Sequence, residues 1–472
     1  MDLSKNKIPE HVNSIHLIAA CGTGMGALAC LLKELGFAVT GSDQHVYPPI
    51  STFLKAKGIN LSQGYSAVNL AHKPDLVVVG NAVSKDNPEV VAMHAMELFY
   101  CSMPQAVNNF AGEGKQVLMV TGTHGKTTTS ALIAWLLESA GLDVSFFIGG
   151  ILANFSSNYK LGKGDFLVVE GDEYDTAYFD KGPKFRHYDP QITILTSVEF
   201  DHADIFHDLE HIKSLFTDFF SHLDGQSTLY AFQHDVNVQE VVQTAVCKLF
   251  YYGINAGDWL ARSIAVEPPW TVFDVYQSKK FHGRLRSPLP GEHNLANVLA
   301  AIAVAAQLQI PVDTIQAGLA SFRGVKRRQE IRGIRNDIVV IDDFAHHPTA
   351  VQKTIQAIRG YYPHQRLVAV FEPRTNTSMR NIFQEVYSQA FDDADLICVR
   401  QPALLKKIPP GQQFSSKRLV AELNKRGLLA FYFENTDKII DYLASEAKPG
   451  DVILVMSNGG FDNIHERLLQ AF

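Results

Sequence analysis

The sequence predicts an α/β protein of three domains, built on parallel β-sheets with helices on both faces. Short, continuously apolar stretches of strand length alternate along the chain with amphipathic helical stretches, the pattern of parallel sheets that are buried on both faces. The chain has 472 residues, of which 46% are hydrophobic and 19% are charged. That length and composition predict about three globular domains with substantial cores.

We place the domain boundaries at residues 1–108, 109–328 and 329–472. The predicted strands of the first domain are 14–20, 38–40 and 75–79. Those of the second domain are 117–121, 165–169 and 192–195. Those of the third domain are 337–341, 366–371, 396–399 and 451–455.

The charge, hydropathy and cysteine content argue against several classes of partner. A net charge of −7 argues against nucleic acid, which favours a basic face. No apolar run reaches the ~18–20 residues of a membrane-spanning helix, and residues 1–10 lack an apolar signal core. The five cysteines are scattered without metal-ligand spacing, which favours a reducing compartment. We expect a cytoplasmic protein, monomeric or weakly dimeric, that binds neither nucleic acid nor membrane.

A phosphate-binding loop is the most informative feature of the chain. The apolar strand at 117–121 leads into Gly122-Thr-His-Gly-Lys-Thr-Thr128, and a helix follows. Backbone N–H groups at such a helix start point at an anion, Lys126 reaches the β- and γ-phosphates, and the Thr127 hydroxyl holds Mg²⁺. The motif departs from the longer consensus, which has Gly where this chain has Val120. The alternative, a solvated turn before an ordinary helix, leaves the strand–loop–helix context unexplained.

A second glycine-rich turn occurs near the N-terminus. Gly22-Thr-Gly-Met-Gly26 lies between a predicted strand and helix, and Asp43 follows the next strand. In the dinucleotide fingerprint the helix start binds a pyrophosphate and the acid binds a ribose hydroxyl. The motif therefore predicts a bound nucleotide diphosphate, with glycines for tight helix–strand packing as the alternative.

Two acidic segments end strands of the second domain. Four acids lie within 170–175, where a Mg²⁺ site is expected because this hard cation prefers carboxylate oxygens. The segment 197–204 adds carboxylates and His202, which position a second metal or a nucleophile. A solvated acidic turn and a structural histidine are the alternatives.

The third domain and the segment before it supply further candidates. Asn294 precedes a predicted helix at 295–307 and is either a ligand-binding residue or a helix cap. Arg328 lies in a basic cluster at 325–330, which either reaches a transferring phosphate or is a solvated linker. Acids and histidines follow a strand at 342–347. The loops around 374 and 458 also follow strands, where ligands bind in open α/β sheets, and plain turns are the alternative there.

These motifs occur in the order found in the Mur ligases, the ATP-dependent amino-acid and peptide ligases of peptidoglycan, which the chain resembles across all three predicted domains. Four motifs carry most of the resemblance: Gly122–Thr128, Glu170–Asp175, Gly291-Glu-His-Asn294 and Asp342-Asp-Phe-Ala-His-His-Pro348. The segments 41–49, 80–84, 172–180, 199–206, 372–377 and 457–461 add to it. The resemblance implies a Rossmann-like first domain that binds UDP-N-acetylmuramate, a central P-loop domain that binds ATP and Mg²⁺, and a Rossmann-like third domain that receives a peptide.

The resemblance also implies roles for individual residues. UDP-muramate is expected at Gly22, Thr23, Gly24, Met25, Gly26, Ser42, Asp43 and Asn81. ATP is expected at Gly122, Thr123, His124, Gly125, Lys126, Thr127, Thr128, His293, Asn294, Arg328 and Asp343. Metal is expected at Thr127, Glu173 and His202, and the peptide at Arg374, Asn376, Asn458 and Gly459. The catalytic residues are expected to be Lys126, His202, Arg328, Asp343 and His346.

The expected reaction activates a carboxylate with ATP. The lactyl carboxylate of UDP-muramate attacks the γ-phosphate, and the amine of L-alanyl-γ-D-glutamyl-meso-diaminopimelate then displaces phosphate, as in peptidoglycan recycling. His202, Asp343 and His346 remain alternatives for the base that deprotonates the amine. Several relatives carry a carbamylated lysine, for which Lys213 is not a secure match. The alternatives are L-alanine as acceptor, a P-loop nucleotide switch or transport ATPase, and an NAD-dependent oxidoreductase.

Overall fold

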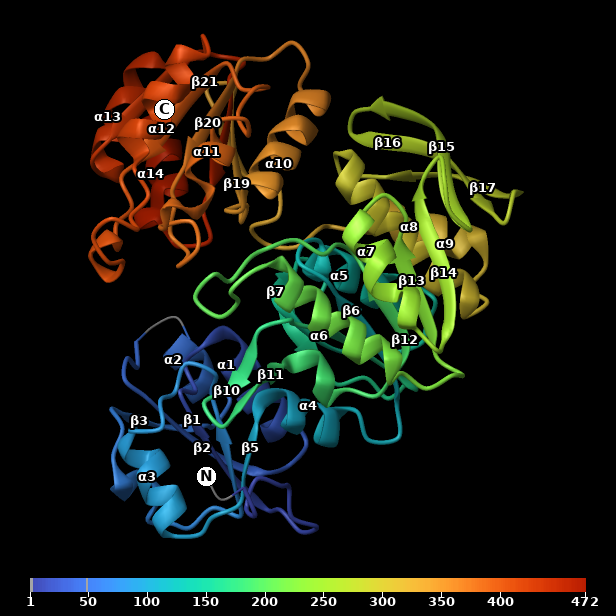
Figure 1. Ribbon diagram of the computed structural model, residues 1–472, viewed down its shortest axis with the longest axis vertical. Helices are drawn as coiled ribbons and strands as arrows, with labels where there is room; N and C mark the ends of the chain where they lie inside the picture. Colours follow the sequence, from blue (N-terminus) through green and yellow to red (C-terminus); the bar gives the residue numbers. More distant parts are fainter. Residues whose placement is uncertain (1–2, 48–49) are drawn as a thin grey trace. The chain divides into compact units, whose positions relative to one another are not determined.

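The computed structural model describes residues 3–47 and 50–472 (Figure 1). Pro48 and Pro49, the last residues of the 41–49 motif, lie outside this part. The chain packs into two compact units. Unit 1 comprises Met1–Val198, Glu210–Tyr252 and Ala300–Gly318, and unit 2 comprises Glu199–Leu209, Gly253–Leu299 and Leu319–Phe472.

The N-terminal part of unit 1 is a five-stranded parallel sheet in the order β3-β2-β1-β4-β5. Its strands are β1 Ser14–Ile18, β2 Ala38–Asp43, β3 Asn60–Gln63, β4 Leu76–Val79 and β5 Tyr100–Ser102. Its helices are α1 Thr23–Glu34, α2 Ile50–Ala56, α3 Pro88–Ala95 and α4 Met103–Ala111. All four residues of β4 are buried, as expected for an apolar run in a sheet covered on both faces.

A second sheet of unit 1 carries the phosphate loop. Its strands run in the order β14-β13-β12-β6-β9-β7-β8 and are parallel except for the pair β7–β8. They are β6 Gln116–Thr121, β7 Ser145–Leu152, β8 Ser157–Lys160, β9 Phe166–Gly171, β12 Pro190–Leu195, β13 Thr228–Phe232 and β14 Lys248–Ile254. The helices here are α5 Lys126–Ser139, α6 Leu209–Ser221 and α7 Val236–Val241, and α8 Glu292–Gln307 and α9 Val312–Ser321 follow later in the chain.

A hairpin joins the two sheets of unit 1. Its strands are β10 Asp175–Ala177 and β11 Asp180–Pro183, which pair in antiparallel fashion. At its tip the hydroxyl of Tyr178 lies 2.7 Å from Nε2 of His94 in α3, and Phe179 packs edge-on against Tyr100 of β5. Both tip residues pack on the buried cluster of the N-terminal sheet. The hairpin therefore ties the acidic segment at 170–175 to the first sheet.

Unit 2 contains an antiparallel element that the sequence reading did not predict. Strands β15 Trp259–Glu267, β16 Trp270–Gln277 and β17 Lys280–Ser287 pair as a meander. The expectation of parallel sheets alone was wrong for this stretch. In β16 buried Thr271, Phe273 and Val275 alternate with less buried residues, which is the period-2 pattern of a half-buried strand.

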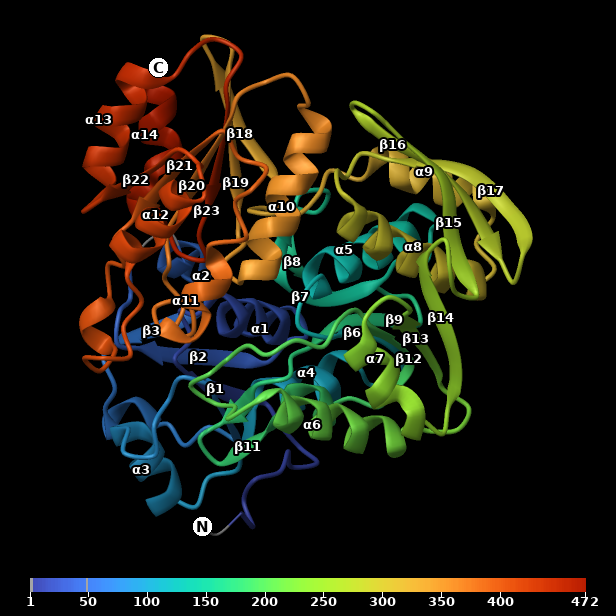
Figure 2. The same ribbon diagram turned by 45° about the horizontal axis from the view of Figure 1, so that its top comes forward.

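The C-terminal sheet of unit 2 runs in the order β18-β19-β23-β20-β21-β22, parallel except for β18. Its strands are β18 Glu330–Arg335, β19 Ile338–Asp343, β20 Leu367–Phe371, β21 Leu396–Arg400, β22 Ala430–Phe433 and β23 Val452–Met456. Its helices are α10 Pro348–Tyr361, α11 Gln384–Tyr387, α12 Ser416–Lys425, α13 Thr436–Glu446 and α14 Ile464–Ala471. Two apolar cores cover its faces, one with α10, α11 and α12 and the other with α13 and α14. In Figure 2 the strands of this sheet lie between α10 and α14.

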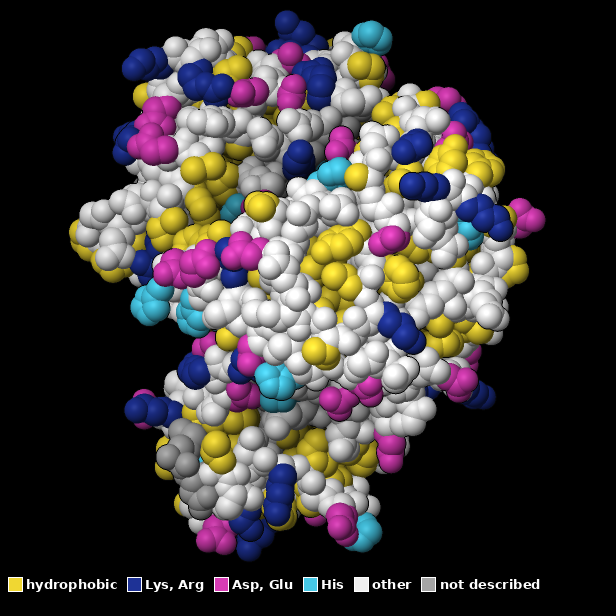
Figure 3. Space-filling model, turned by 45° about the vertical axis from the view of Figure 1, so that its right-hand side comes forward, with side chains coloured by type: hydrophobic (Ala, Val, Ile, Leu, Met, Phe, Trp, Pro, Cys, Tyr) yellow, Lys and Arg dark blue, Asp and Glu magenta, His cyan; other side chains and the backbone are white. Residues whose placement is uncertain are grey.

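The surface mixes charges of both signs. On the face drawn in Figure 3, Lys and Arg side chains lie interspersed with Asp and Glu side chains. In the described part of the chain, every helix is too short or too polar to cross a bilayer.

Candidate active site

The phosphate loop of unit 1 has the strand–loop–helix context that the sequence predicted. It connects β6 to α5, and Gly122 and Gly125 adopt φ of +119° and +82°. The segment after β12 braces it, because the N–H groups of Thr123 and His124 donate to the carbonyl and the hydroxyl of Ser197, each at 2.9 Å. A Cβ at Gly122 would lie 2.5 Å from Thr196 Oγ1. The loop is therefore held in one shape, with the N-terminus of α5 free to bind an anion.

Lys126 lies among carboxylates at the start of α5. Its Nζ donates to Glu173 Oε2 at 2.8 Å and to the Gly122 carbonyl at 2.6 Å. Both side chains are nearly buried, at 12% and 2% exposure. Burial acts to lower the pKa of Lys126, but Glu173, Asp172 and Glu170 outweigh it and the pKa is raised. The lysine is therefore charged at neutral pH, as phosphate binding requires.

The acidic segment offers hard oxygen ligands next to this lysine. Glu170 at the end of β9 accepts from the N–H of Gly149 at 2.9 Å and from the Thr127 hydroxyl. Its pKa is raised by burial and by Asp172. Thr127, Glu170 and Glu173 together match the donor set that Mg²⁺ prefers. The sequence reading placed a Mg²⁺ site in the 170–175 segment and named Thr127 and Glu173 as individual ligands, but not Glu170, which lies one residue before the end of β9.

The remaining acids of this segment have other partners. Asp172 pairs with Lys184 at 2.9 Å. Burial acts to raise the pKa of Asp172, but Lys184 and Lys126 outweigh it and the pKa is lowered. Asp175 pairs with Lys181 in the β10–β11 hairpin, also at 2.9 Å.

The N-terminal glycine turn lies next to Asp43, because β1 and β2 are neighbours. Asp43 Oδ2 accepts from the N–H of Cys21 at 2.9 Å. A Cβ at Gly24 would lie 3.0 Å from Met103 Sδ, and one at Gly26 would lie 3.0 Å from Ile50 Cδ1. These two glycines therefore serve close packing, whereas the nearest atom to a Cβ at Gly22 is 3.9 Å away.

The other residues predicted for this turn differ in exposure. Ser42 is fully buried, and its hydroxyl donates to buried Glu89 at 2.5 Å. Met25 is buried in α1, whereas Thr23 and Asn81 are exposed at the carboxyl edge of the sheet.

Unit 2 brings together segments that are far apart in the sequence. His346 Nε2 lies 3.7 Å from Asp201 Oδ2, and Asn376 Nδ2 donates to Asp204 Oδ2 at 3.0 Å. Burial acts to raise the pKa of Asp201, but His346 and His202 outweigh it and the pKa is lowered. His202 follows Asp201 with φ of +52°. An ionised carboxylate therefore faces His346.

A second constellation of unit 2 is centred on Gln329. Its backbone N–H donates to Asp343 Oδ2 at 2.8 Å, and its side-chain oxygen accepts from Asn294 Nδ2 at 3.0 Å. His293 Nε2 lies 3.4 Å from Gln329 Nε2. Burial raises the pKa of Asp343 although Arg328 acts to lower it, and the Arg328 guanidinium lies over the Phe344 ring. The predicted residues of this group thus lie around a glutamine that sequence reasoning missed.

Asn294 is not the cap of its helix. The helix α8 begins at Glu292, and Asn294 lies inside its first turn. Its Nδ2 also donates to the Pro290 carbonyl at 2.8 Å. The predicted start at residue 295 was therefore three residues late.

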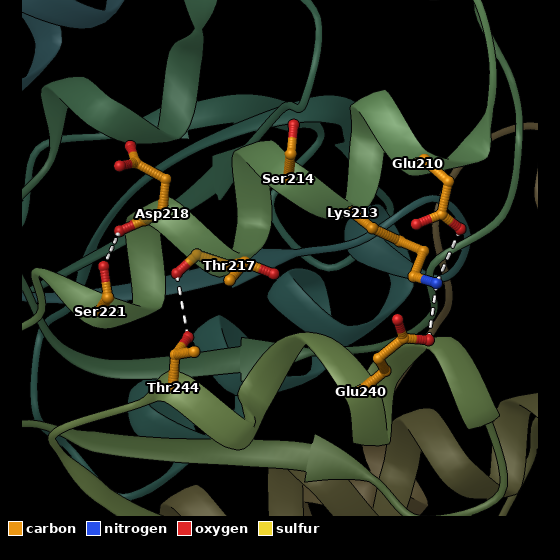
Figure 4. Close-up of a pocket in the computed structure, with 8 residues that line it drawn as sticks. All are labelled: Glu210, Lys213, Ser214, Thr217, Asp218, Ser221, Glu240 and Thr244. Atoms are coloured by element: carbon orange, nitrogen blue, oxygen red, sulfur yellow. Dashed lines mark hydrogen bonds and ion pairs between the residues drawn. The ribbon is translucent and has the colours of Figure 1, made fainter.

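Lys213 is buried in unit 1 and is held by two glutamates. Its Nζ lies 2.9 Å from Glu210 and 2.6 Å from Glu240 in a cleft between α6 and α7 (Figure 4). Glu240 and Glu210 raise its pKa, so the amine stays protonated. Carbamylation needs the neutral amine, and these ion pairs disfavour it.

Comparison with known proteins gives matches along most of the chain. Family models match as the Mur ligase family catalytic domain at 14–114, the Mur ligase middle domain at 120–305 and the Mur ligase glutamate ligase domain at 327–459. The chain is 41% identical to the UDP-N-acetylmuramate–L-alanyl-γ-D-glutamyl-meso-2,6-diaminoheptandioate ligase of Escherichia coli K12, over 97% of this chain and 98% of that one.

Two solved structures resemble the fold over nearly its whole length. A murein peptide ligase of Psychrobacter arcticus 273-4 has a TM-score of 0.71 and 34% identity, covering 97% of this chain and 98% of that one. The UDP-N-acetylmuramate–alanine ligase of Thermotoga maritima has a TM-score of 0.80 and 25% identity, covering 98% and 99%.

Proposed function

The chain belongs to the Mur ligase family, and we propose that it joins the lactyl carboxylate of UDP-N-acetylmuramate to the amine of L-alanyl-γ-D-glutamyl-meso-diaminopimelate at the expense of ATP. The observation that carries this proposal is the 41% identity over 97% of the chain with the E. coli ligase named for these substrates. The braced phosphate loop and the charged Lys126 support ATP as the energy source.

We assign one substrate to each of the three Mur ligase domains. Residues 1–108 bind UDP-N-acetylmuramate, residues 109–328 bind ATP and Mg²⁺, and residues 329–472 receive the peptide. The family-model matches at 14–114, 120–305 and 327–459 support this division. We also propose that the protein is a monomer or weak homodimer in the cytoplasm.

The first step gathers negative charge, because a carboxylate approaches a triphosphate. Lys126 binds the β- and γ-phosphates, and the N-terminus of α5 donates backbone N–H groups to them. Thr127, Glu173 and Glu170 would hold Mg²⁺, which would supply further positive charge at the phosphates. One carboxylate oxygen forms a bond to the γ-phosphorus, the bond to ADP breaks, and an acyl phosphate results.

The second step needs a neutral amine and a proton acceptor. The amine nitrogen attacks the acyl carbon, phosphate leaves, and the amine loses one proton. We assign this proton to His346, because the lowered pKa of Asp201 keeps that carboxylate ionised and it lies 3.7 Å from Nε2 of His346. Asp343 is a weaker base candidate because it already accepts hydrogen bonds from Gln329 and Ala345. We place Asp343 with Arg328, His293 and Asn294 at the nucleotide, and His202 at a second metal.

An acceptor assay tests the proposal. ADP release is measured with UDP-N-acetylmuramate and ATP, and with either the tripeptide or L-alanine as acceptor. We expect kcat/KM for the tripeptide to exceed that for L-alanine by about 10- to 150-fold, the difference that a lost charged hydrogen bond commonly makes.

The same assay decides between the alternatives. The likeness to the Thermotoga alanine ligase favours L-alanine as the second candidate acceptor, and a preference for L-alanine would overturn the proposal. ADP release that is equally fast without UDP-N-acetylmuramate would instead identify a nucleotide switch or a transport ATPase.

A further inference from the structure

A fully buried carboxylate, Glu372, lies beneath the loops to which we assign the peptide. It follows β20 and is 0% exposed. Its Oε2 accepts from the Ser457 hydroxyl at 2.7 Å, and its Oε1 accepts from Arg400 and, at 3.4 Å, from Arg374. A carboxylate is buried at such a place only when charged and polar partners compensate for lost water. Three separate segments of the chain thus meet on this one side chain.

Arg400 keeps Glu372 in place. Its side chain is 8% exposed, and its second terminal nitrogen pairs with Asp462 Oδ2 at 2.6 Å. Carboxylates therefore hold both terminal nitrogens of the Arg400 guanidinium. Because Arg400 is immobile, the shared carboxylate presents a fixed acceptor to the more exposed Arg374.

Gly459 fixes the path of the Arg374 side chain. A Cβ at Gly459 would lie 2.0 Å from Cδ and 2.1 Å from Nε of Arg374. The arginine therefore lies directly on the backbone of the loop that follows β23. Arg327, which precedes β18, also holds this loop, because its Nη2 donates to the carbonyls of Ser457 at 2.5 Å and Gly459 at 2.7 Å.

Arg374 keeps capacity for a ligand in this arrangement. Its side chain is 30% exposed, and the contact of its Nη1 with Glu372 is long, at 3.4 Å. A guanidinium has five N–H donors, and a pair of them matches the two oxygens of a carboxylate. The contact with Glu372 sets the plane of the Arg374 guanidinium, and the exposed part of the side chain faces solvent.

We propose that Glu372 is a positioning residue, which together with Gly459 orients the Arg374 guanidinium to receive a carboxylate of the acceptor peptide. This inference rests on the proposed function, because it takes Arg374 as a peptide-binding residue. It adds that specificity for an acidic acceptor depends on a buried residue that does not itself contact the peptide.

The test is a set of kinetic measurements on variants of the full chain. Glu372→Gln keeps the shape and removes the charge. We expect the tripeptide KM to rise at least about tenfold, as for a weakened charge-assisted hydrogen bond. The KM values for ATP and UDP-N-acetylmuramate, and kcat at saturating tripeptide, should stay within about twofold. Gly459→Ala should have the same selective effect through displacement of Arg374, and it keeps the inference testable if Glu372→Gln does not fold.

Asp451→Asn is the matched control. Asp451 is also a buried carboxylate, 3% exposed, and pairs with Arg366 at 3.0 and 2.6 Å just before β23. Its loss, like that of Glu372, should lower thermal stability but should leave the tripeptide KM unchanged. A rise in that KM for Asp451→Asn would show that any weakening of the sheet has this effect and would overturn the inference.

A double variant separates this inference from the proposed function. Arg374→Ala should raise the tripeptide KM, and adding Glu372→Gln should raise it no further. If Arg374→Ala leaves that KM unchanged, the peptide assignment itself fails. The positioning role alone fails if Arg374→Ala raises the tripeptide KM and neither Glu372→Gln nor Gly459→Ala does. It also fails alone if Glu372→Gln raises the KM of all three substrates alike.

Discussion

Lys126→Met replaces the buried lysine of the phosphate loop with an uncharged side chain of similar length. In the proposed reaction it removes a cation from the transferring phosphate, for which a loss of about 10²–10³-fold in kcat is usual. UDP-N-acetylmuramate should still bind, because its proposed site lies on the N-terminal sheet. The measurements are ADP release with saturating substrates and calorimetric titration of UDP-N-acetylmuramate.

The same substitution has an electrostatic cost that follows from the structure. It leaves Glu173, Glu170 and Asp172 without the cation that lies 2.8 Å from Glu173, and one carboxylate is then expected to take up a proton. At pH 7 this costs about 1.36 kcal/mol for each pH unit above an ordinary Glu pKa of about 4.3, or about 3.7 kcal/mol. That value agrees with the about 3–5 kcal/mol typical of a broken buried ion pair.

The stability deficit should shrink as the pH falls. A carboxyl with a raised folded pKa binds more protons in the folded than in the unfolded state, so low pH favours the folded variant. At pH 5.5 the same arithmetic gives about 1.6 kcal/mol, a recovery of about 2 kcal/mol that denaturant unfolding at the two pH values would detect. Lys213→Met is the control, because Lys213 also pairs with two glutamates. This substitution should leave turnover unchanged. Wild-type turnover in Lys126→Met, or a deficit independent of pH, would refute the reasoning.

Three further predictions concern the loop, a buried acid and the metal. Gly122→Ala should raise the KM for ATP and cost about 1–3 kcal/mol of stability, since the position has φ of +119° and no space for a Cβ. Gly114→Ala, at a position with φ of +70° and nothing within 4 Å of a Cβ, is the control for backbone strain alone. An equal KM for ATP in the two variants would contradict the steric argument. The lowered pKa of Asp201 stabilises the fold at pH values above the ordinary Asp pKa of 3.8, and this stability is lost as the pH falls through the folded pKa. The melting temperatures of wild type and Asp201→Asn should therefore converge below about pH 4. A difference in melting temperature that does not change with pH would exclude this role. Chelation of Mg²⁺ should abolish ADP release but not UDP-N-acetylmuramate binding, and turnover that survives exhaustive chelation would contradict the metal assignment.

The sequence sufficed for the fold class because the buried parallel strands are uninterrupted apolar runs. The run at 75–79 is an example, since all of β4 is buried. It did not suffice for β15–β17, because this antiparallel meander lies outside the βα pattern. It also placed the start of α8 too late, because the first turn of that helix is polar.

The sequence identified the phosphate loop and its acids because they are contiguous motifs. It gave no role to Gln329 or Glu372, although both lie in segments that it named, 325–330 and 372–377. Their roles depend on partners elsewhere in the chain. Nor did spacing along the chain predict that Asp201 faces His346, which depends on how the 199–209 segment packs within unit 2. Side-chain partnerships of this kind follow from tertiary topology rather than from local pattern.

The β10–β11 hairpin has a consequence for how such enzymes diversify. Tyr178 and Phe179 cover part of the apolar core of the first sheet although they are encoded after the phosphate loop. Recombination at the predicted boundary near residue 108 would graft a foreign first domain onto a hairpin shaped for another surface. An exchange of sugar-nucleotide domains between homologues should therefore succeed only when the hairpin tip is transplanted with them.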